Sequence, residues 1–175
     1  EQSPYMDDVP VMSAISWKST PVKNNINTYC NSTATDADNT TIGSVTGTRF
    51  VNGIFKGNVT WTSVANGTTE SLPFAHTNYT AGDKINCTFQ AKSGTSYSNK
   101  VASTLQTVIA KIFGRVTNAA GTGVASAKVY VIKTDDNTLF STNTTNSTGY
   151  WWVVSSAKMN FSTLSFLPTN RSLGT

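Results

Sequence analysis

Apolar and polar residues alternate with a period of two along most of this chain, and hardly any segment repeats apolar residues at helical spacing. Successive side chains of a β-strand point to opposite faces, so this alternation predicts strands with one buried and one exposed face. The clearest case is the segment 84–91, where Ile85, Cys87, Phe89 and Ala91 share one parity and polar residues take the other. The sequence therefore predicts an all-β chain.

The strands are short, and turn residues separate them at intervals typical of two packed sheets. After Ser103 the predicted strands are separated by clusters of Gly and Asn, and we place a domain boundary near residue 107. With 175 residues, the chain has room for two tandem β-sandwiches, at 19–107 and 108–175, preceded by a segment at 1–18. The strands expected after the boundary are Lys111–Thr117, Ala127–Lys133, Leu139–Thr142 and Tyr150–Val154.

Asn52-Gly53 marks a tight hairpin, because both residues readily adopt the positive φ angles that a two-residue turn needs. The predicted strands flanking this turn are 48–51 and 54–56. Val59 and Trp61 are expected to begin a further strand.

Cys30 and Cys87 lie 57 positions apart, and each falls on the inward parity of its strand. That arrangement predicts a disulfide between two central strands of opposite sheets. Two buried thiols in a reducing compartment are the alternative.

Residues 28–104 resemble the immunoglobulin-like repeats of large prokaryotic, especially archaeal, extracellular proteins. The segments that carry the resemblance are TYCNSTATDADNTT, TRFVNGIFKG and YTAGDKINCTFQAKSGTSYSNKV. The family usually has Trp where this chain has Phe50, and the tyrosine corner common in immunoglobulin folds would fall at Ile85.

Residues 111–154 resemble the carboxypeptidase regulatory-like or transthyretin-like module, a small sandwich common in secreted proteins. The matching positions are Gly114, Val116, Gly121, Val124, Ala127, Val129, Gly149 and Tyr150. Such modules are accessory scaffolds, so the resemblance implies a chain that is not an enzyme.

The chain has ten Asn-x-Ser/Thr motifs, about twice the number that its composition would give by chance. These motifs make it a candidate for N-glycosylation. The acceptors beside Cys30, Cys87 and Val59 fall on the exposed parity of their strands. The alternative is that Asn and Thr simply suit turns and exposed β-surface. The ten acceptors are Asn31, Asn39, Asn58, Asn66, Asn78, Asn86, Asn143, Asn146, Asn160 and Asn170.

The N-terminal segment reads as one long strand from Val9 to Trp17. After Val154 the second domain offers one further strand, and we expect a final strand to be missing from it. We therefore predict that this segment completes a sheet in a neighbouring subunit. It is equally expected as the first strand of its own domain. The predicted subunit-interface residues are Val9, Val11, Ile15 and Trp17.

Basic residues are scattered, with a net charge of only +4, which argues against a nucleic-acid partner. No apolar run reaches the length of a membrane span. His76 alone offers little for catalysis, so no catalytic residues are expected. Asp36 with Asp38, and Asp135-Asp136, are expected as solvated turns rather than metal sites, and no cofactor is expected apart from N-linked glycans.

Trp151-Trp152 on one strand should place one indole in the core and the other outside, against a sugar ring, a subunit contact or ordinary neighbours. Together these patterns predict a structural, N-glycosylated subunit of an extracellular cell-surface filament that assembles head to tail by strand complementation. A cell-surface adhesin or carbohydrate-binding module is the first alternative. An accessory fragment of a larger surface enzyme is the second.

Overall fold

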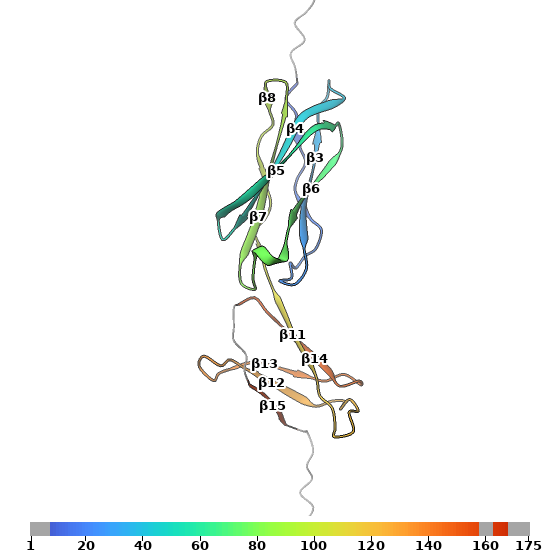
Figure 1. Cartoon of the computed structure of the whole chain (residues 1–175), viewed down its shortest axis with the longest axis vertical. Helices are drawn as coiled ribbons and strands as arrows, with labels where there is room; N and C mark the ends of the chain where they lie inside the picture. The colour runs from blue at the N-terminus through green and yellow to red at the C-terminus, as the bar shows by residue number, and fades with distance from the viewer. Residues whose placement is uncertain (1–7, 158–162, 168–175) are drawn as a thin grey trace, which may run out of the picture. The chain divides into compact units, whose positions relative to one another are not determined.

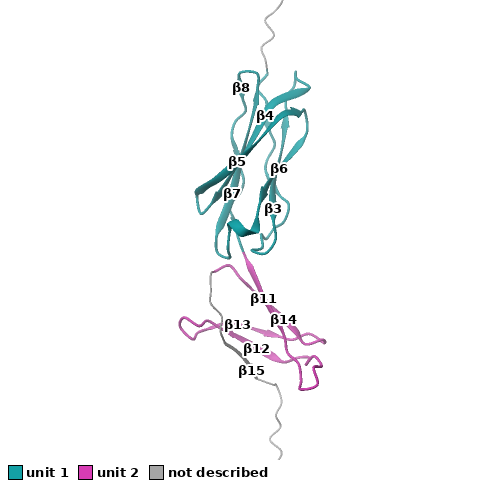
Figure 2. Cartoon of the chain, viewed as in Figure 1, with its two compact units in different colours: residues 1–108 teal, residues 109–175 magenta. Residues whose placement is uncertain are grey.

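The computed structural model describes residues 8–157 and the strand at 163–167. It confirms an all-β fold, since the described residues form fifteen strands and one short 3-10 helix, η1 (His76–Asn78) (Figure 1). The chain divides into two compact units, residues 1–108 and 109–175, which Figure 2 distinguishes by colour.

Unit 1 is a sandwich of two antiparallel sheets. In the first sheet β3 (Thr28–Thr35) is central, with β6 (Thr69–Phe74) on one side and β1 (Val11–Met12) and β2 (Ser16–Trp17) on the other. The second sheet runs β10-β7-β4-β5, with β8 and β9 also paired to β7. Its strands are β4 (Thr41–Val51), β5 (Ile54–Ala65), β7 (Lys84–Ser93), β8 (Ser96–Tyr97), β9 (Val101–Ala102) and β10 (Gln106–Thr107).

The hairpin between β4 and β5 turns at Asn52-Gly53, as predicted. Both residues have positive φ angles, 52° and 76°, and Val51 pairs directly with Ile54. The expected break before Val59 is wrong, because β5 continues to Ala65. The register of β4 and β5 shifts at Gly57, whose φ is 114°, so a bulge takes up one extra residue without ending the strand.

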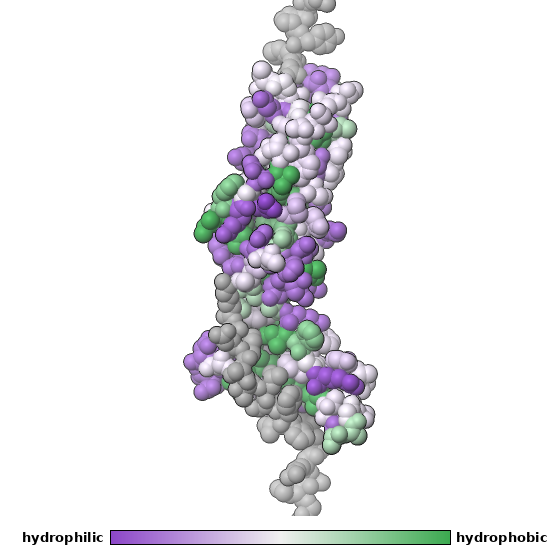
Figure 3. Space-filling model, in the orientation of Figure 1, coloured by the Kyte–Doolittle hydropathy of each residue, from purple (hydrophilic) through white to green (hydrophobic). Residues whose placement is uncertain are grey.

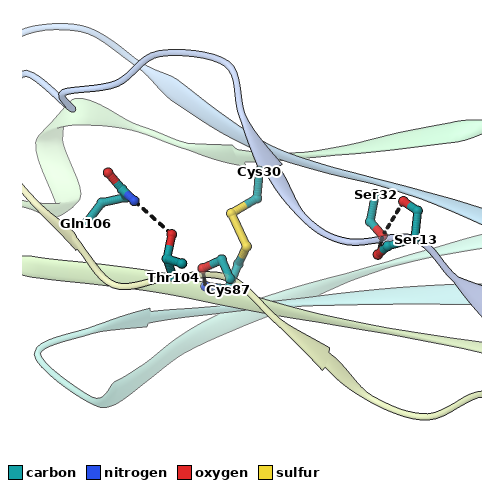
Figure 4. The surroundings of a disulfide bond; sticks show 7 residues. Ser13, Cys30, Ser32, Cys87, Thr104 and Gln106 are labelled. Atoms are coloured by element: carbon teal, nitrogen blue, oxygen red, sulfur yellow. Dashed lines mark hydrogen bonds between the residues drawn. A yellow bond between two sulfur atoms is a disulfide. The ribbon is translucent and has the colours of Figure 1, made fainter.

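The predicted disulfide joins β3 to β7 across the sandwich (Figure 4). Cys30 and Cys87 are both fully buried, and their Cα atoms are 6.7 Å apart. Around them, apolar residues from the two sheets form one core cluster, which includes Leu72 and Phe89. The alternation seen in the sequence thus places the inward parity of both cysteine strands in the core.

The N-terminal segment differs from the long strand that we predicted. It pairs with β3 of its own unit as two short strands, with Val11 opposite Thr35 and Ser16 opposite Asn31. One extra residue between these pairs changes the parity, and the Ser13 hydroxyl accepts a hydrogen bond from the Thr33 amide there, at 2.9 Å. The described residues therefore show the alternative arrangement, a first strand of the chain's own domain.

Tyr79 supplies a buried tyrosine hydrogen bond in unit 1. Its ring is 3% exposed, and its hydroxyl donates to the Ile26 carbonyl at 2.5 Å. Burial raises the pKa of the Tyr79 hydroxyl. This contact ties the connection before β7 to the loop before β3, although Ile85 occupies the position of the usual tyrosine corner.

Unit 2 consists of a two-stranded sheet packed on a three-stranded sheet. The order of the larger sheet is β13-β12-β15, and the four strands predicted from the sequence are confirmed. Among the side chains of unit 2 that the structure describes, the core comprises Val129, Val131, Trp151 and Val153, with three partly buried neighbours. The strands are β11 (Ala110–Arg115), β12 (Lys128–Ile132), β13 (Leu139–Thr144), β14 (Tyr150–Ser155) and β15 (Thr163–Leu167).

Candidate functional site

The two strands of the smaller sheet in unit 2 present their outer side chains as one continuous face. Antiparallel pairing sets Lys111 opposite Val154, Phe113 opposite Trp152, and Arg115 opposite Tyr150. The intervening residues point the other way, toward the core. We call these six residues the aromatic face: Lys111, Phe113, Arg115, Tyr150, Trp152 and Val154.

The apolar side chains of the aromatic face are well exposed. Phe113 is 71% exposed, Trp152 48% and Tyr150 46%. The side of the molecule drawn in Figure 3 is mostly hydrophilic or intermediate in hydropathy, with apolar patches in a few places. Clustered exposed aromatic residues on a polar protein are typical of binding surfaces.

Two cations lie over the rings of the aromatic face. The Lys111 Nζ is 4.9 Å from the centroid of the Trp152 ring, and the Arg115 Cζ is 5.2 Å from that of Tyr150. Both distances are within the range of cation–π attraction. The Arg115 Nε also donates to the Thr148 carbonyl at 3.1 Å, which fixes the direction of the guanidinium group.

Gly114 and Trp151 pack together on the core side of the β11–β14 sheet, below the aromatic face. Gly114 lies against the Trp151 indole, and a Cβ at this position would come within 2.8 Å of the ring. Trp151 is therefore buried, at 1% exposure, directly below the face. This arrangement confirms the prediction that one indole of the pair lies inside and the other outside.

The loop before β14 is also held firmly. The Asn146 side-chain oxygen accepts hydrogen bonds from the Thr148 amide, the Thr148 hydroxyl and the Tyr150 amide, at 2.8 to 3.0 Å. In addition, the Asn143 side chain donates to the Trp152 carbonyl. A face held in place before binding loses little conformational entropy when a ligand arrives.

This arrangement suits ligands that have both an apolar surface and polar groups. Aromatic rings bury the apolar side of such a ligand, while the edges of the face remain polar. A sugar ring has this character, because its C–H groups form apolar patches and its hydroxyl groups point outward. The aromatic face can therefore stack with sugar rings and pair with anionic groups.

The four predicted interface residues do not lie on one face of the N-terminal segment. Val9 and Val11 are exposed, at 57% and 61%, whereas Ile15 and Trp17 pack partly buried against the core of unit 1. The change of parity at Ser13 separates the two pairs. An apolar groove of about 270 Å3 runs beside the exposed pair and is lined by Val9, Pro10, Val11, Met12, Asn99 and Val101.

A second hollow, of about 310 Å3, lies over β12 and β13. Its lining is more polar than that of the groove in unit 1. The lining residues are Lys128, Tyr130, Thr142, Asn143 and Thr144.

The glycosylation acceptors differ in how accessible their amide nitrogens are. Asn58 and Asn78 are exposed, and neither side chain has a hydrogen-bond partner among the described residues. Asn31 and Asn86 are half-buried. Asn66 and Asn146 are exposed and Asn39 and Asn143 half-buried, while Asn160 and Asn170 lie outside the described residues.

Asn66 pins two loops together instead of pointing freely into solvent. Its side-chain oxygen accepts from the Asp36 amide at 3.1 Å, and its side-chain nitrogen donates to the carbonyls of Asp36 and Asn39. Two of these bonds use the two hydrogens of the side-chain amide, and an N-linked glycan would replace one of those hydrogens. Asn66 is therefore a structural residue of this end of unit 1.

Replacing Asn66 with alanine should lower the unfolding free energy of unit 1 by about 1–2 kcal/mol, because the loop carbonyls lose their donors. The matched control is Asn58→Ala, which removes an exposed acceptor and should change stability by less than about 0.5 kcal/mol. Urea denaturation of both variants measures the difference. Equal losses would show that Asn66 is no more structural than Asn58.

The acidic turns fall into two kinds. Asp136 accepts from the hydroxyl and amide of Thr138, which lowers the pKa of the Asp136 carboxyl, and this turn is exposed as predicted. Asp36, predicted to be solvated, is only 4% exposed. A hydrogen bond between the side chains of Asp36 and Asp38 lowers the pKa of Asp36 and raises that of Asp38.

Neither acidic turn assembles a metal site. Within residues 8–157 and the strand at 163–167, no three His, Cys, Asp or Glu side chains are grouped so that they could hold a metal ion. His76 is exposed, and its Nδ1 lies 2.9 Å from the Asn27 side-chain oxygen.

Comparison with known proteins adds little. No family model and no curated protein matches the chain. A Ca2+-stabilized adhesin that helps an Antarctic bacterium bind ice has a similar structure, with 16% identity and a TM-score of 0.35 over 86% of this chain and 41% of that one. The crystal structure of native alpha-2-macroglobulin from Escherichia coli, spanning domains NIE-MG1, matches with 10% identity and a TM-score of 0.28. The match covers 94% of this chain and 99% of that one.

Neither similarity is strong enough to define the function of this chain, which spans less than half of the adhesin chain. Within the described residues, no helix has the length and apolar character that crossing a bilayer requires.

Proposed function

We propose that this chain is a non-catalytic extracellular surface protein of the adhesin type, and that the aromatic face of unit 2 binds carbohydrate. The observation that carries this proposal is the set of three exposed rings on one side of the β11–β14 ribbon. A ligand-free face of this kind leaves apolar area in water, which a sugar ring would cover.

The rest of the chain supports an extracellular setting for this function. The buried disulfide between β3 and β7 is of a kind that persists in oxidising compartments. The exposed acceptors Asn58 and Asn78 are the best placed for N-linked glycans, which would add a polar layer to a chain with few charges. In this proposal unit 2 carries the binding face.

A glycan array probed with the whole chain tests the proposal. We expect Trp152→Ala to weaken binding about tenfold or more, since stacked aromatic anchors dominate such contacts. The matched control is Tyr97→Ala, because Tyr97 is a ring of unit 1 with 57% exposure and its own cation, Lys92, at 5.2 Å. Absence of any glycan binding, or an equal loss in the Tyr97 variant, would refute it.

A filament subunit is the second candidate. The observation in its favour is that the β11–β14 sheet has only two strands among the described residues, so a strand from another subunit could extend it. The N-terminal segment is a poor donor, because Met12, Ile15 and Trp17 already pack in unit 1. Electron microscopy of native material should show regular filaments if the chain polymerises, and a variant lacking residues 1–17 that still polymerised would exclude that segment as the donor.

A further inference from the structure

The charges of the aromatic face are all of one sign. Lys111 and Arg115 are its only charged side chains, and the structure contains no carboxylate paired with either of them in its described part. The two cations lie on the same strand with one aromatic residue, Phe113, between them. The face therefore combines exposed rings with two positive charges, one over Trp152 and one over Tyr150.

The geometry of the ribbon sets the distance between the Cα atoms of these two cationic residues. Four residues of β-strand separate Lys111 from Arg115, or about 13 Å along β11. The Phe113 and Trp152 pair lies midway between them. A linear ligand lying along β11 would meet Lys111 over the Trp152 ring, then Phe113, and then Arg115 over the Tyr150 ring.

A neutral ligand would contact the rings of the aromatic face but would not pair with its two positive charges. A neutral sugar could stack on the rings, but it would give neither cation a counter-charge. Lys111 would keep its ring contact at 4.9 Å, and Arg115 its ring contact at 5.2 Å and its hydrogen bond to the Thr148 carbonyl. A carboxylate or sulfate could pair with either cation without displacing it from its ring, because both groups keep donors that point away from the ring. Charge complementarity thus favours an anionic ligand.

Given the carbohydrate-binding function proposed above, we propose that the ligand is an anionic polysaccharide bound lengthwise along the β11–β14 ribbon. Its sugar rings stack on Phe113 and Trp152, and its carboxylate or sulfate groups pair with Lys111 and Arg115. Single-stranded nucleic acid also combines flat rings with regular negative charge. The extracellular setting indicated by the disulfide favours the polysaccharide.

The test compares matched polymers on the whole chain. Polygalacturonate and alginate are each measured beside their methyl-esterified forms, which keep the sugar backbone and lose the charge. We expect esterification to weaken binding about tenfold at low salt, and 1 M salt to remove most of the difference, because the Debye length then falls to about 3 Å.

Variants locate the effect on the aromatic face. The double change Lys111→Ala and Arg115→Ala should reduce affinity for the acidic polymers about tenfold and leave the esterified forms unchanged. Lys128→Ala is the matched control, since it removes an exposed cation from β12. Circular dichroism of each variant checks that the fold is retained.

The outcomes separate this inference from the function on which it rests. Equal binding of acidic and esterified polymers, with loss on Trp152→Ala, would overturn the anionic ligand and leave the carbohydrate-binding function standing. Failure of every polysaccharide on the array and in this set would overturn both. Tighter binding of oligo-dT than of any polysaccharide would replace the proposed ligand with single-stranded nucleic acid.

Discussion

Replacing Trp151 with alanine should cost unit 2 about 3–5 kcal/mol of unfolding free energy, which is the usual range for a buried tryptophan. Where the structure describes the side chains of unit 2, its core cluster comprises four buried residues, and Trp151 is the largest of them. Small domains have little stability to lose. We therefore expect unit 2 of the Trp151→Ala variant to be largely unfolded at 37 °C.

The adjacent residue provides the control. Trp152 is 48% exposed, so Trp152→Ala should alter the stability of unit 2 by less than about 1 kcal/mol. Hydrogen exchange of the whole chain, followed by mass spectrometry, distinguishes the two variants: β11, β12 and β14 should lose protection only in the first. Similar protection in both variants would mean that the core of unit 2 does not depend on Trp151.

Replacing Cys30 and Cys87 together with alanine should lower the unfolding free energy of unit 1 by about 4 kcal/mol. The disulfide closes a loop of 57 residues, and opening it returns that much conformational freedom to the unfolded chain in the chain-entropy estimate. Removing two fully buried sulfur atoms also loosens the packing between β3 and β7.

Urea denaturation measures the loss, with the amides of β3 and β7 followed by hydrogen exchange as a local check on unit 1. Wild-type chain reduced in urea and refolded with its thiols blocked from oxidation should lose a similar amount. Unit 2 serves as the internal control, because its amides should keep their protection. A loss below about 1 kcal/mol would show that packing alone holds the two sheets together.

Local patterns in the sequence predict most of the strands. Alternation gives β7 and its inward cysteine, Asn52-Gly53 gives the hairpin turn, and the glycine and asparagine clusters separate the strands of unit 2. Each of these depends on residues close together in the chain, where the period of two and the turn angles act directly.

The errors arise where one extra residue shifts the register. Between Met12 and Ser16 one additional residue moves the apolar positions to the other face, so Val9 and Val11 are exposed although Ile15 and Trp17 are not. The bulge at Gly57 similarly lets β5 run on past a position where the pattern suggests an end. A single-residue bulge needs a tertiary partner to stabilise it, and the sequence alone does not show that partner.

The aromatic face was only partly predictable. The alternation of Lys111, Phe113 and Arg115, and of Tyr150 and Trp152, indicates two exposed rows. Their alignment depends on the pairing of β11 with β14, which are separated by more than thirty residues. The sequence therefore predicts an outward indole but not the ring and the cation that lie beside it.

The disulfide also limits how far the chain can be stretched. If tension were applied to the two ends of unit 1, the residues between Cys30 and Cys87 could not extend, because the disulfide transmits the force directly between the two cysteines. Fully extended, the part of the chain enclosed by the disulfide would be about 200 Å long. Under tension, unit 1 would therefore lengthen only through the residues outside this loop.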